Sequence, residues 1–192
     1  MPKVVDIAQR RAQLTEATAR LIARSGIESA TMREVAAEAG WTTGALTHYF
    51  ADKRELLLTT FQTSLANRRE LRPNDEDADP AAQLRASLEG ALPLDESRRR
   101  HWMVTIAFCS QATGDAELAA TQRDAYREFR AHVAALVKRC ELADGRGAET
   151  YAERLIAVAD GIAVQALFDE DGWPARRQLE RLEQLLAPLG VR

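Results

Sequence analysis

The stretch TMREVAAEAGWTTGALTHYFADK, residues Thr31 to Lys53, decides the fold of this chain. Thr31 and Glu34 have the spacing of a capping box, in which the two side chains bond free backbone N–H groups at the start of a helix. Apolar residues then recur at the spacing of one helical face: Met32, Val35, Ala36 and Ala39. Gly40 can adopt the left-handed conformation that ends a helix. We therefore expect a short helix over 32–39.

A second short helix follows almost at once. Thr42 offers a hydroxyl that can cap it, so the turn between the two helices holds only a few residues. Two short helices joined so tightly must cross steeply, which is the helix-turn-helix arrangement. Asp52 and Glu55 repeat the capping pattern at the start of the next helix. A helix from about Asp6 to Ser25 precedes the motif and should brace it.

The composition is typical of a water-soluble globular protein. The 192 residues are 46% hydrophobic and 29% charged. No apolar run approaches the roughly 18 to 20 residues of a membrane span, and the first residues show no secretory signal. We expect a cytoplasmic protein. Cys109 and Cys140 lie among apolar helical residues, so buried, reduced thiols are expected rather than a disulfide.

The charge is distributed unevenly. Residues 1–72 contain eleven Lys or Arg and eight Asp or Glu, net +3, while residues 73–192 contain fifteen and twenty-one, net −6. A mildly basic first segment on an acidic remainder suits a DNA reader, although +3 is also common on ordinary solvated surfaces. Arg10 and Arg11 in the first helix could meet phosphates or simply be solvated.

Helical periodicity continues to the end of the chain. A helix from about Lys53 should run for roughly 30 Å until Pro73 stops it, and the acidic segment Asn74 to Pro80 should be an exposed loop. Further helices are expected over 81–92, 95–114, 115–144, 148–168 and 174–186. No segment shows the alternation of a strand. The predicted fold class is all-α.

The segment from about Arg10 to Leu57 resembles the DNA-binding domain of the TetR family of bacterial regulators. The matching positions are Thr31, Arg33 to Ala36, Ala39, Gly40, Gly44, Leu46, His48, Tyr49, Phe50, Lys53 and Leu56. More loosely, PLDESRRRHWMVTIAF and DEDGWP resemble the effector domain of the choline-pathway (BetI-like) repressor type. The resemblance implies about nine helices. Residues 1–55 would form the three-helix DNA-binding domain, joined by a long fourth helix to a helical effector-binding and dimerisation domain over 56–192.

This resemblance implies a homodimeric transcription factor, most simply a repressor that a small-molecule effector releases from a palindromic operator. Its partners would be double-stranded DNA, the effector and a second copy of the chain; no cofactor, metal site or catalytic residue is expected. A helical protein-interaction or signalling module, whose helix-turn-helix no longer reads DNA, is the alternative. An enzyme is the least supported class, because the chain has no Gly-rich phosphate loop, G-x-S-x-G elbow or cluster of His and Cys.

A recognition helix places its N-terminal residues in the major groove. The expected DNA contacts are Thr31, Arg33, Thr42, Thr43, Gly44, Thr47, His48, Tyr49 and Lys53. Gly44 costs a helix about 1 kcal/mol relative to Ala, so it either lets the backbone approach DNA or is merely tolerated. Arg33 could contact a guanine edge or a phosphate. Lys53 stands where a helix dipole disfavours a cation, which fits a phosphate clamp or a solvated side chain.

Two positions depart from the family pattern. Trp41 stands in the turn, where a small aliphatic residue is common, and is expected to plug the space between helices, with base stacking as the alternative. Thr47 stands where a Tyr is common. The phosphate contact there becomes shorter or is lost, and a methyl contact with thymine becomes possible.

The remaining helices should hold the effector and the dimer interface. Aromatic and polar residues that could line a pocket, or simply form a core, are Trp102, Met103, Ile106, Tyr126, Phe129, Asp160 and Gln165. Asp160 with an aromatic ring could hold a cation, or make a structural hydrogen bond. In the resembled family the last two helices pair between subunits. The corresponding residues, which could equally form an intramolecular core, are Ala159, Ile162, Ala163, Ala166, Leu179, Leu182 and Leu186.

Overall fold

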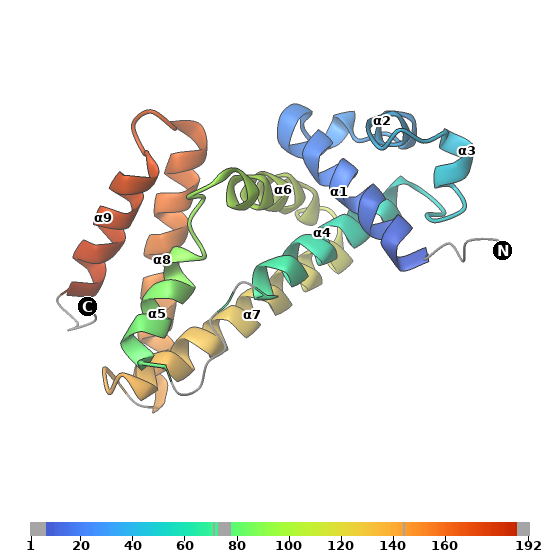
Figure 1. Cartoon of the computed structure of the whole chain (residues 1–192). Helices are drawn as coiled ribbons and strands as arrows, with labels where there is room; N and C mark the ends of the chain where they lie inside the picture. The colour runs from blue at the N-terminus through green and yellow to red at the C-terminus, as the bar shows by residue number, and fades with distance from the viewer. Residues whose placement is uncertain (1–6, 71, 73–77, 144, 188–192) are drawn as a thin grey trace. The chain divides into compact units, whose positions relative to one another are not determined.

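The computed structural model describes residues 7–70, 72, 78–143 and 145–187, and in these residues it contains only helices (Figure 1). The predicted all-α class is therefore confirmed. The helices are α1 Ile7–Ser25, the 3-10 turn η1 Ile27–Ser29, α2 Met32–Glu38, α3 Thr43–Leu46, α4 Lys53–Glu70, α5 Pro80–Glu89, α6 Glu96–Ala112, α7 Ala116–Arg139, α8 Gly145–Phe168 and α9 Ala175–Leu186.

The chain divides into two compact units. Unit 1 comprises Met1–Asn67 and Met103–Thr121, and unit 2 comprises Arg68–Trp102 and Gln122–Arg192. Helices α4, α6 and α7 each contribute residues to both units. The units reflect contacts within the fold and not the limits of a function. The domain boundary expected between residues 55 and 56 therefore stays a prediction.

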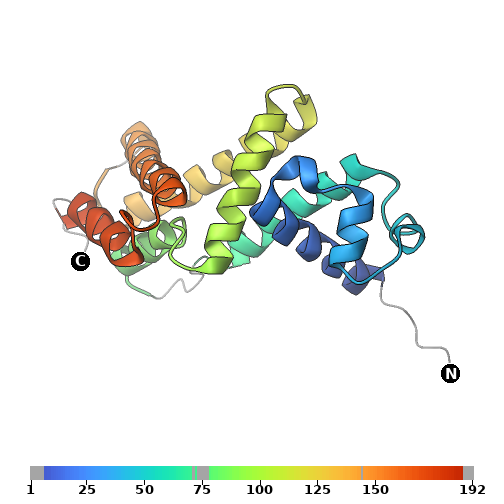
Figure 2. The same cartoon turned by 90° about the horizontal axis from the view of Figure 1, so that it is seen from above.

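The core of unit 1 closes the helix-turn-helix against α1 and α4. Figure 2 shows α2 beside α1, and α3 packs against α2. Leu14, Val35, Leu46 and Leu56 are fully buried in this core. The same core includes the end of α6, because Phe108 stacks on Phe61 with 4.7 Å between ring centroids and 10° between ring planes. Burial of these apolar side chains from five helices holds the short helices in place, since neither would be stable alone.

The predicted helix caps form, with two differences. Thr31 Oγ1 accepts a hydrogen bond from the Glu34 N–H at 3.2 Å, but the Glu34 carboxylate bonds Arg33 instead of returning to Thr31, so the first capping box is only half made. Asp52 Oδ1 accepts from the Glu55 N–H at 2.8 Å, and Glu55 Oε2 accepts from the N–H of Ala51, one residue earlier than the motif predicts. In both cases a nearby donor competes for the Glu carboxylate.

Unit 2 is built around the packing of α5, α8 and α9. Leu84 and Leu88 of α5, Leu155 of α8, and Leu182 and Leu186 of α9 are buried here, and Figure 1 shows α8 and α9 running side by side. Asp79 caps α5 by accepting from the N–H groups of residues 81 and 82, directly before Pro80 in the first turn. Pro174 precedes α9 as its cap rather than beginning it.

Two sequence predictions about single segments have different outcomes. The predicted stop at Pro73 and most of the acidic loop over 74–80 lie outside the described residues. The prediction of two buried thiols is wrong, since Cys109 is exposed and Cys140 half-buried. Both cysteines lie at the edge of an apolar stripe, and helical periodicity places such an edge only to within one residue.

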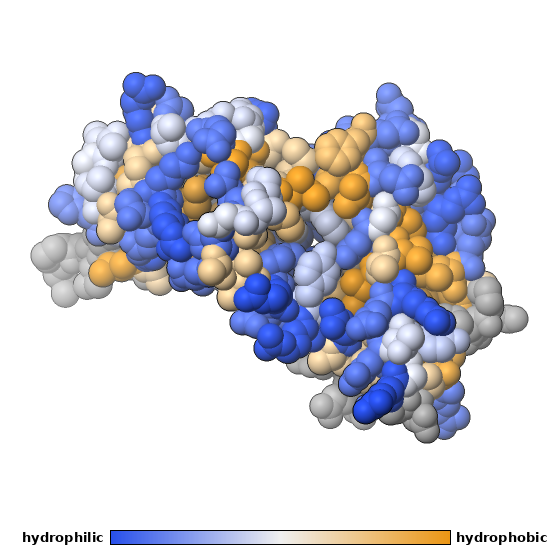
Figure 3. Space-filling model, turned by 180° about the vertical axis from the view of Figure 1, so that it is seen from behind, coloured by the Kyte–Doolittle hydropathy of each residue, from blue (hydrophilic) through white to orange (hydrophobic). Residues whose placement is uncertain are grey.

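The surface is mixed in character. Figure 3 shows, on one face, hydrophobic residues that reach the surface among hydrophilic ones. Among the described residues, the exposed large hydrophobic side chains are Ile7, Val158, Phe168 and Leu179. Within the ranges that the structure describes, no helix is long and apolar enough to cross a lipid bilayer.

Candidate nucleic-acid interface

The turn between α2 and α3 is held by three local features. Gly40 has φ of 72°, the left-handed region that glycine adopts without a steric penalty. The Trp41 N–H then donates to the Ala36 carbonyl oxygen at 2.7 Å. Thr42 Oγ1 accepts from the Ala45 N–H at 3.2 Å and so caps α3. These bonds set the angle at which α3 leaves α2.

One face of the α3 segment is anchored and the other is free. Leu46 is fully buried in the unit 1 core. The predicted contacts on the opposite face are all exposed: Thr42, Thr43, Gly44, Thr47 and His48. A Cβ built on Gly44 would meet nothing within 4 Å, so packing does not require glycine at this position. Short polar groups on an exposed, capped helix start have the character of a groove-reading surface.

Trp41 takes part in packing, as the plug interpretation predicted. It is half-buried against the unit 1 core and meets Tyr49 edge to face, with ring centroids 5.4 Å apart and 67° between planes. The guanidinium carbon of Arg10 lies 5.1 Å from the Trp41 ring centroid. Tyr49 is likewise half-buried, so its ring serves the packing of the turn, and its contact with DNA stays a prediction.

Arg11 makes structural contacts, and its contact with a phosphate stays a prediction. Its guanidinium donates to the Tyr49 carbonyl oxygen and, at 3.0 Å, to Glu55 Oε1, and it lies 4.1 Å from the Phe50 ring centroid. The pKa of the Glu55 carboxyl is lowered by the hydrogen bond from the Ala51 N–H and then by Arg11. Arg11 therefore ties α1 to the end of the recognition segment and to α4.

The cations around this surface differ in availability. The side chain of Arg33 is 83% exposed and bonds only its neighbour Glu34, at 2.8 Å. Lys53 is half-buried at the start of α4, and no ion pair or hydrogen bond of its side chain is found among the described residues. Arg54, in contrast, binds Asp115 at 3.0 Å and Glu117 at 2.7 Å. Arg33, whose ion pair is with the adjacent Glu34, and Lys53 therefore stay the predicted phosphate contacts.

The predicted effector residues are only partly brought together. Trp102, Tyr126, Phe129 and Asp160 surround one side chain in unit 2, that of Arg68. Met103 and Ile106 belong to unit 1 and are half-buried there. Gln165 is exposed and donates to the Gly161 carbonyl oxygen of its own helix. Of the seven residues predicted to line a pocket, four therefore lie around Arg68 and three do not.

Within this group, polar contacts are specific. The Tyr126 hydroxyl donates to Asp160 Oδ2 at 2.8 Å, which is the structural hydrogen bond expected as one alternative for Asp160. Burial raises the pKa of the Asp160 carboxyl, although Tyr126 and the charge of Arg68 act in the opposite direction. Trp102 Nε1 donates to the Ala91 carbonyl oxygen at 2.7 Å and so fixes the indole ring.

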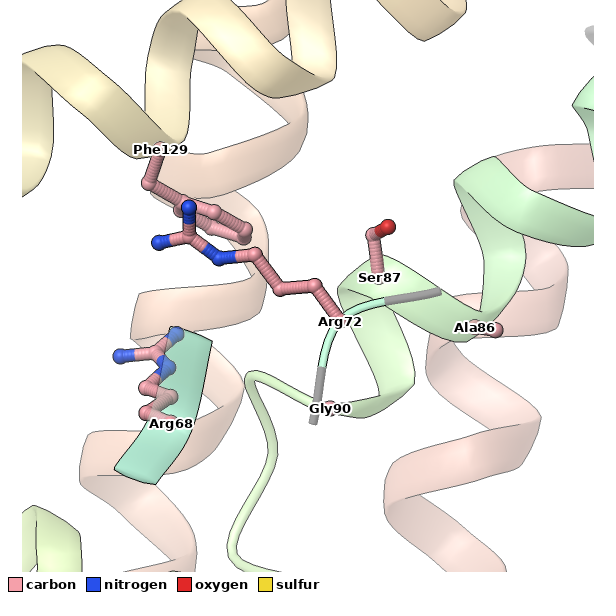
Figure 4. A pocket seen from close by; sticks show the side chains of 6 residues that line it. All are labelled: Arg68, Arg72, Ala86, Ser87, Gly90 and Phe129. Atoms are coloured by element: carbon pink, nitrogen blue, oxygen red, sulfur yellow. The ribbon is translucent and has the colours of Figure 1, made fainter. Parts of the chain in front are cut away.

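Sequence reasoning missed two basic residues, Arg68 and Arg72, that line a pocket in unit 2. In the helix predicted to run until Pro73, a spacing of four residues would place Arg68 and Arg72 on one face. In the structure α4 ends at Glu70, and Arg72 lies just beyond it. The pocket they line also contains Ser87 and Phe129 (Figure 4). The spacing was the available signal.

Most of the predicted dimer residues lie inside one chain. Ala159, Ala163 and Leu186 have no exposed surface, and Ile162, Ala166 and Leu182 are at most 5% exposed. They pack α8, α9 and α5 together, which was the alternative interpretation of the same pattern. Only Leu179, 36% exposed, can meet another chain without rearrangement. A helix can pack against different partners on different faces. Periodicity alone does not show whether the partner of a given face belongs to the same chain.

This geometry defines a helix-turn-helix protein whose short second helix presents hydroxyls, a glycine and an imidazole on a surface that the major groove can accept. Residues 14–60 match the family of bacterial regulatory proteins called the tetR family, and residues 80–190 match the C-terminal domain of the BetI-type transcriptional repressor. The chain belongs to the TetR family, and it is a DNA-binding transcriptional regulator.

Individual relatives cover nearly the whole chain. The HTH-type transcriptional regulator PksA of Bacillus subtilis is 32% identical over 97% of this chain and 90% of its own length. The HTH-type transcriptional regulator BetI of Burkholderia mallei is 30% identical, with 98% and 99% covered. A transcriptional regulator from Rhodococcus has a solved structure with a TM-score of 0.84 at 30% identity, covering 93% and 95%.

A further solved structure carries a ligand. It is a transcriptional regulator from Saccharomonospora viridis in complex with choline, with a TM-score of 0.81, 23% identity, and 94% and 96% of the two chains covered. At this identity the similarity shows the shared fold.

Proposed function

We propose that this protein is a homodimeric repressor of the bacterial cytoplasm, which binds a palindromic operator and leaves it when a small molecule binds unit 2. The observation that carries the proposal is the exposed face of α3 together with the caps and the Arg11 contacts that fix it. A rigid, exposed reading helix is what specific recognition of a groove requires.

The effector signal has a physical route in this proposal. Trp102, at the Arg68 group, and Phe108, in the core that holds the helix-turn-helix, are both residues of α6. A ligand that favours one of two positions of α6 would therefore also bias the packing under α1 and α4. The ligand acts only through its different affinities for the two arrangements.

Specific binding needs two copies of the reading helix, about 34 Å apart on successive turns of DNA. We propose that the exposed face of α8, with Val158, Gly161, Gln165 and Phe168 at helical spacing, contacts a second chain together with Leu179 of α9. Phe168 is 76% exposed, an unusual position for a large aromatic side chain that has no partner. The proposed surface differs from the set predicted from the sequence, of which only Leu179 is exposed.

The test is binding of a fluorescent duplex from the region upstream of the gene, followed by anisotropy. Wild-type protein should bind with a stoichiometry of two chains per site, and Thr43→Glu should weaken binding at least about tenfold, because it places a carboxylate against phosphates. Thr43 is exposed, so the fold should tolerate the change. Thr150→Glu, also exposed but on α8, is the matched control. Equal affinity of the two variants would exclude α3 as the reading helix.

A further inference from the structure

The place predicted for a ligand cation is occupied by a cation of the chain itself. The guanidinium carbon of Arg68 lies 5.2 Å from the ring centroid of Phe129 and 5.9 Å from that of Trp102. Asp160, which accepts the hydrogen bond of Tyr126, is the negative group that interacts electrostatically with Arg68. Two aromatic faces and a carboxylate are the elements of a cation site, and here Arg68 already satisfies them. A positively charged ligand would have to displace it.

A second arginine adds charge that the protein does not fully compensate. The guanidinium carbon of Arg72 lies 5.1 Å from the centroid of the Phe129 ring, which Arg68 also contacts. Its Nη1 bonds Glu128 at 3.1 Å, but its Nε is buried and has no hydrogen-bond partner in the described residues. Glu128 also pairs with Arg69, so one carboxylate serves two arginines. A buried N–H group without an acceptor is an unfavourable arrangement that a bound acceptor would relieve.

Arg68 is similarly short of anionic partners. Among the described residues no carboxylate oxygen forms an ion pair with it, and its Nη1 lies 3.4 Å from His101 Nε2. Burial lowers the pKa of Arg68; the charge of Asp160 acts in the opposite direction, and the charge of Arg72 adds a smaller lowering. Burial likewise lowers the pKa of Arg72. Both effects mean that the two guanidinium groups would be stabilised by a nearby negative charge.

These groups line one pocket. Its walls are Arg68, Arg72, Ala86, Ser87, Gly90 and Phe129, and the space between them is small and partly open to solvent. Figure 4 shows both guanidinium groups near Phe129, with Arg72 lying across its ring, and Ser87 on the neighbouring helix α5. The Ser87 hydroxyl lies 2.9 Å from His132 Nε2. The pocket thus combines two cations, a hydroxyl and one aromatic wall.

We infer that this pocket binds a small oxyanion group, a carboxylate or a phosphate, and that the effector of the proposed repressor is therefore an anionic molecule and not a quaternary ammonium ion. The effector role rests on the function proposed above. Guanidinium groups bind planar carboxylates and phosphates with two parallel hydrogen bonds. The Phe129 ring would contact a short apolar part of the same ligand.

The experiment is calorimetric titration of the full chain, without DNA, with inorganic phosphate, butyrate and choline chloride at constant ionic strength. Phosphate or butyrate should bind, and the tighter of the two identifies the headgroup; choline should not compete with it. Arg68→Gln and Arg72→Gln should each weaken anion binding roughly 10- to 100-fold, the loss of a charge-assisted hydrogen bond. Arg181→Gln changes the net charge equally on the exposed face of α9 and should have no effect.

Two results would overturn the inference. Choline could bind more tightly than both anions, or Arg68→Gln and Arg181→Gln could lower anion affinity equally, which would indicate binding by general surface charge. Because calorimetry needs no DNA, it decides on the anion site even if operator binding fails. Anion binding without release of operator DNA would leave the site in place and refute its role as the effector site.

A second variant separates binding from folding. Arg68→Met keeps a long unbranched stem against the aromatic rings but removes the charge. If Arg68 is held ready for an anion, this variant should have a Tm equal to or above that of the wild type without anion, since replacing a poorly compensated buried charge is often neutral or stabilising. It should also lose the rise in Tm that phosphate or butyrate causes in the wild type. A large drop in Tm, with no effect of anions on the wild type, would show Arg68 to be a structural cation.

Discussion

The guanidinium of Arg11 donates a hydrogen bond to the backbone carbonyl oxygen of Tyr49, a residue 38 positions further along the chain. The same group binds Glu55 at the start of α4. One side chain of α1 therefore joins the end of the reading segment to the helix that follows it. This bond holds the chain just after α3, as the capped turn holds it just before.

Arg11→Ala should destabilise the protein by roughly 1 to 3 kcal/mol, because a partly buried carbonyl and a carboxylate lose their donor. It should also weaken operator binding, because Arg11 fixes the end of the reading segment. Thermal unfolding and anisotropy measure the two effects. Arg24→Ala, which removes an exposed ion pair with Glu38, is the control and should change both much less. Normal operator affinity of Arg11→Ala would contradict the positioning role.

Gly40 and Gly44 should respond in opposite ways to alanine. Gly40→Ala places a side chain at φ of 72° and should cost roughly 1 to 2 kcal/mol of stability. Gly44→Ala meets open space and should raise stability by up to about 1 kcal/mol. If Gly44 lets the backbone approach DNA, the stabler variant should nevertheless bind the operator more weakly. Undiminished binding would mean that Gly44 is merely tolerated.

Lys53→Ala should weaken binding to all DNA sequences and reduce the slope of log affinity against log salt concentration by about one. The physical reason is the loss of one phosphate contact and of the counterion released there. Anisotropy at several salt concentrations measures the slope. Lys138→Ala removes the same charge from an exposed position of α7 and should leave it unchanged. An unaltered slope in Lys53→Ala would exclude the phosphate contact.

His132 should make stability depend on pH. Burial lowers its pKa below the ordinary value, and the charge of Arg72 lowers it further. The unfolded chain therefore binds more protons here than the folded chain, so this contribution to stability is full above about pH 6.5 and is lost as the pH falls below it. The wild-type Tm should drop more between pH 7.5 and 5.5 than that of His132→Gln. Equal drops would assign the pH dependence to other groups.

Phe168→Asp should turn the proposed dimer into a monomer, because it places a charge in the middle of an apolar contact. Phe168 is 76% exposed in the single chain, so the variant should fold normally. Sedimentation velocity measures the mass, and operator affinity should fall with it. Glu153→Gln, an exposed change on another face of α8, should remain dimeric. A dimeric Phe168→Asp would move the interface elsewhere.

Local patterns were sufficient for the helices and for the reading surface. Thr42 caps its helix and Gly40 takes the left-handed conformation, both as spacing alone predicted. Each of these features depends on residues within one or two turns, where geometry follows from the order of residue types. The exposure of Thr43 and His48 follows from the same periodicity.

Only the tertiary structure decided what lies opposite each helical face. It joined Arg11 to the Tyr49 carbonyl, placed Ala159 and Ala163 inside one chain, and set Arg68 in the aromatic site where a ligand cation had been considered. These outcomes depend on contacts between residues far apart in the sequence. Periodicity states that a face is apolar or charged, but the choice of partner follows from the three-dimensional packing of all the helices together.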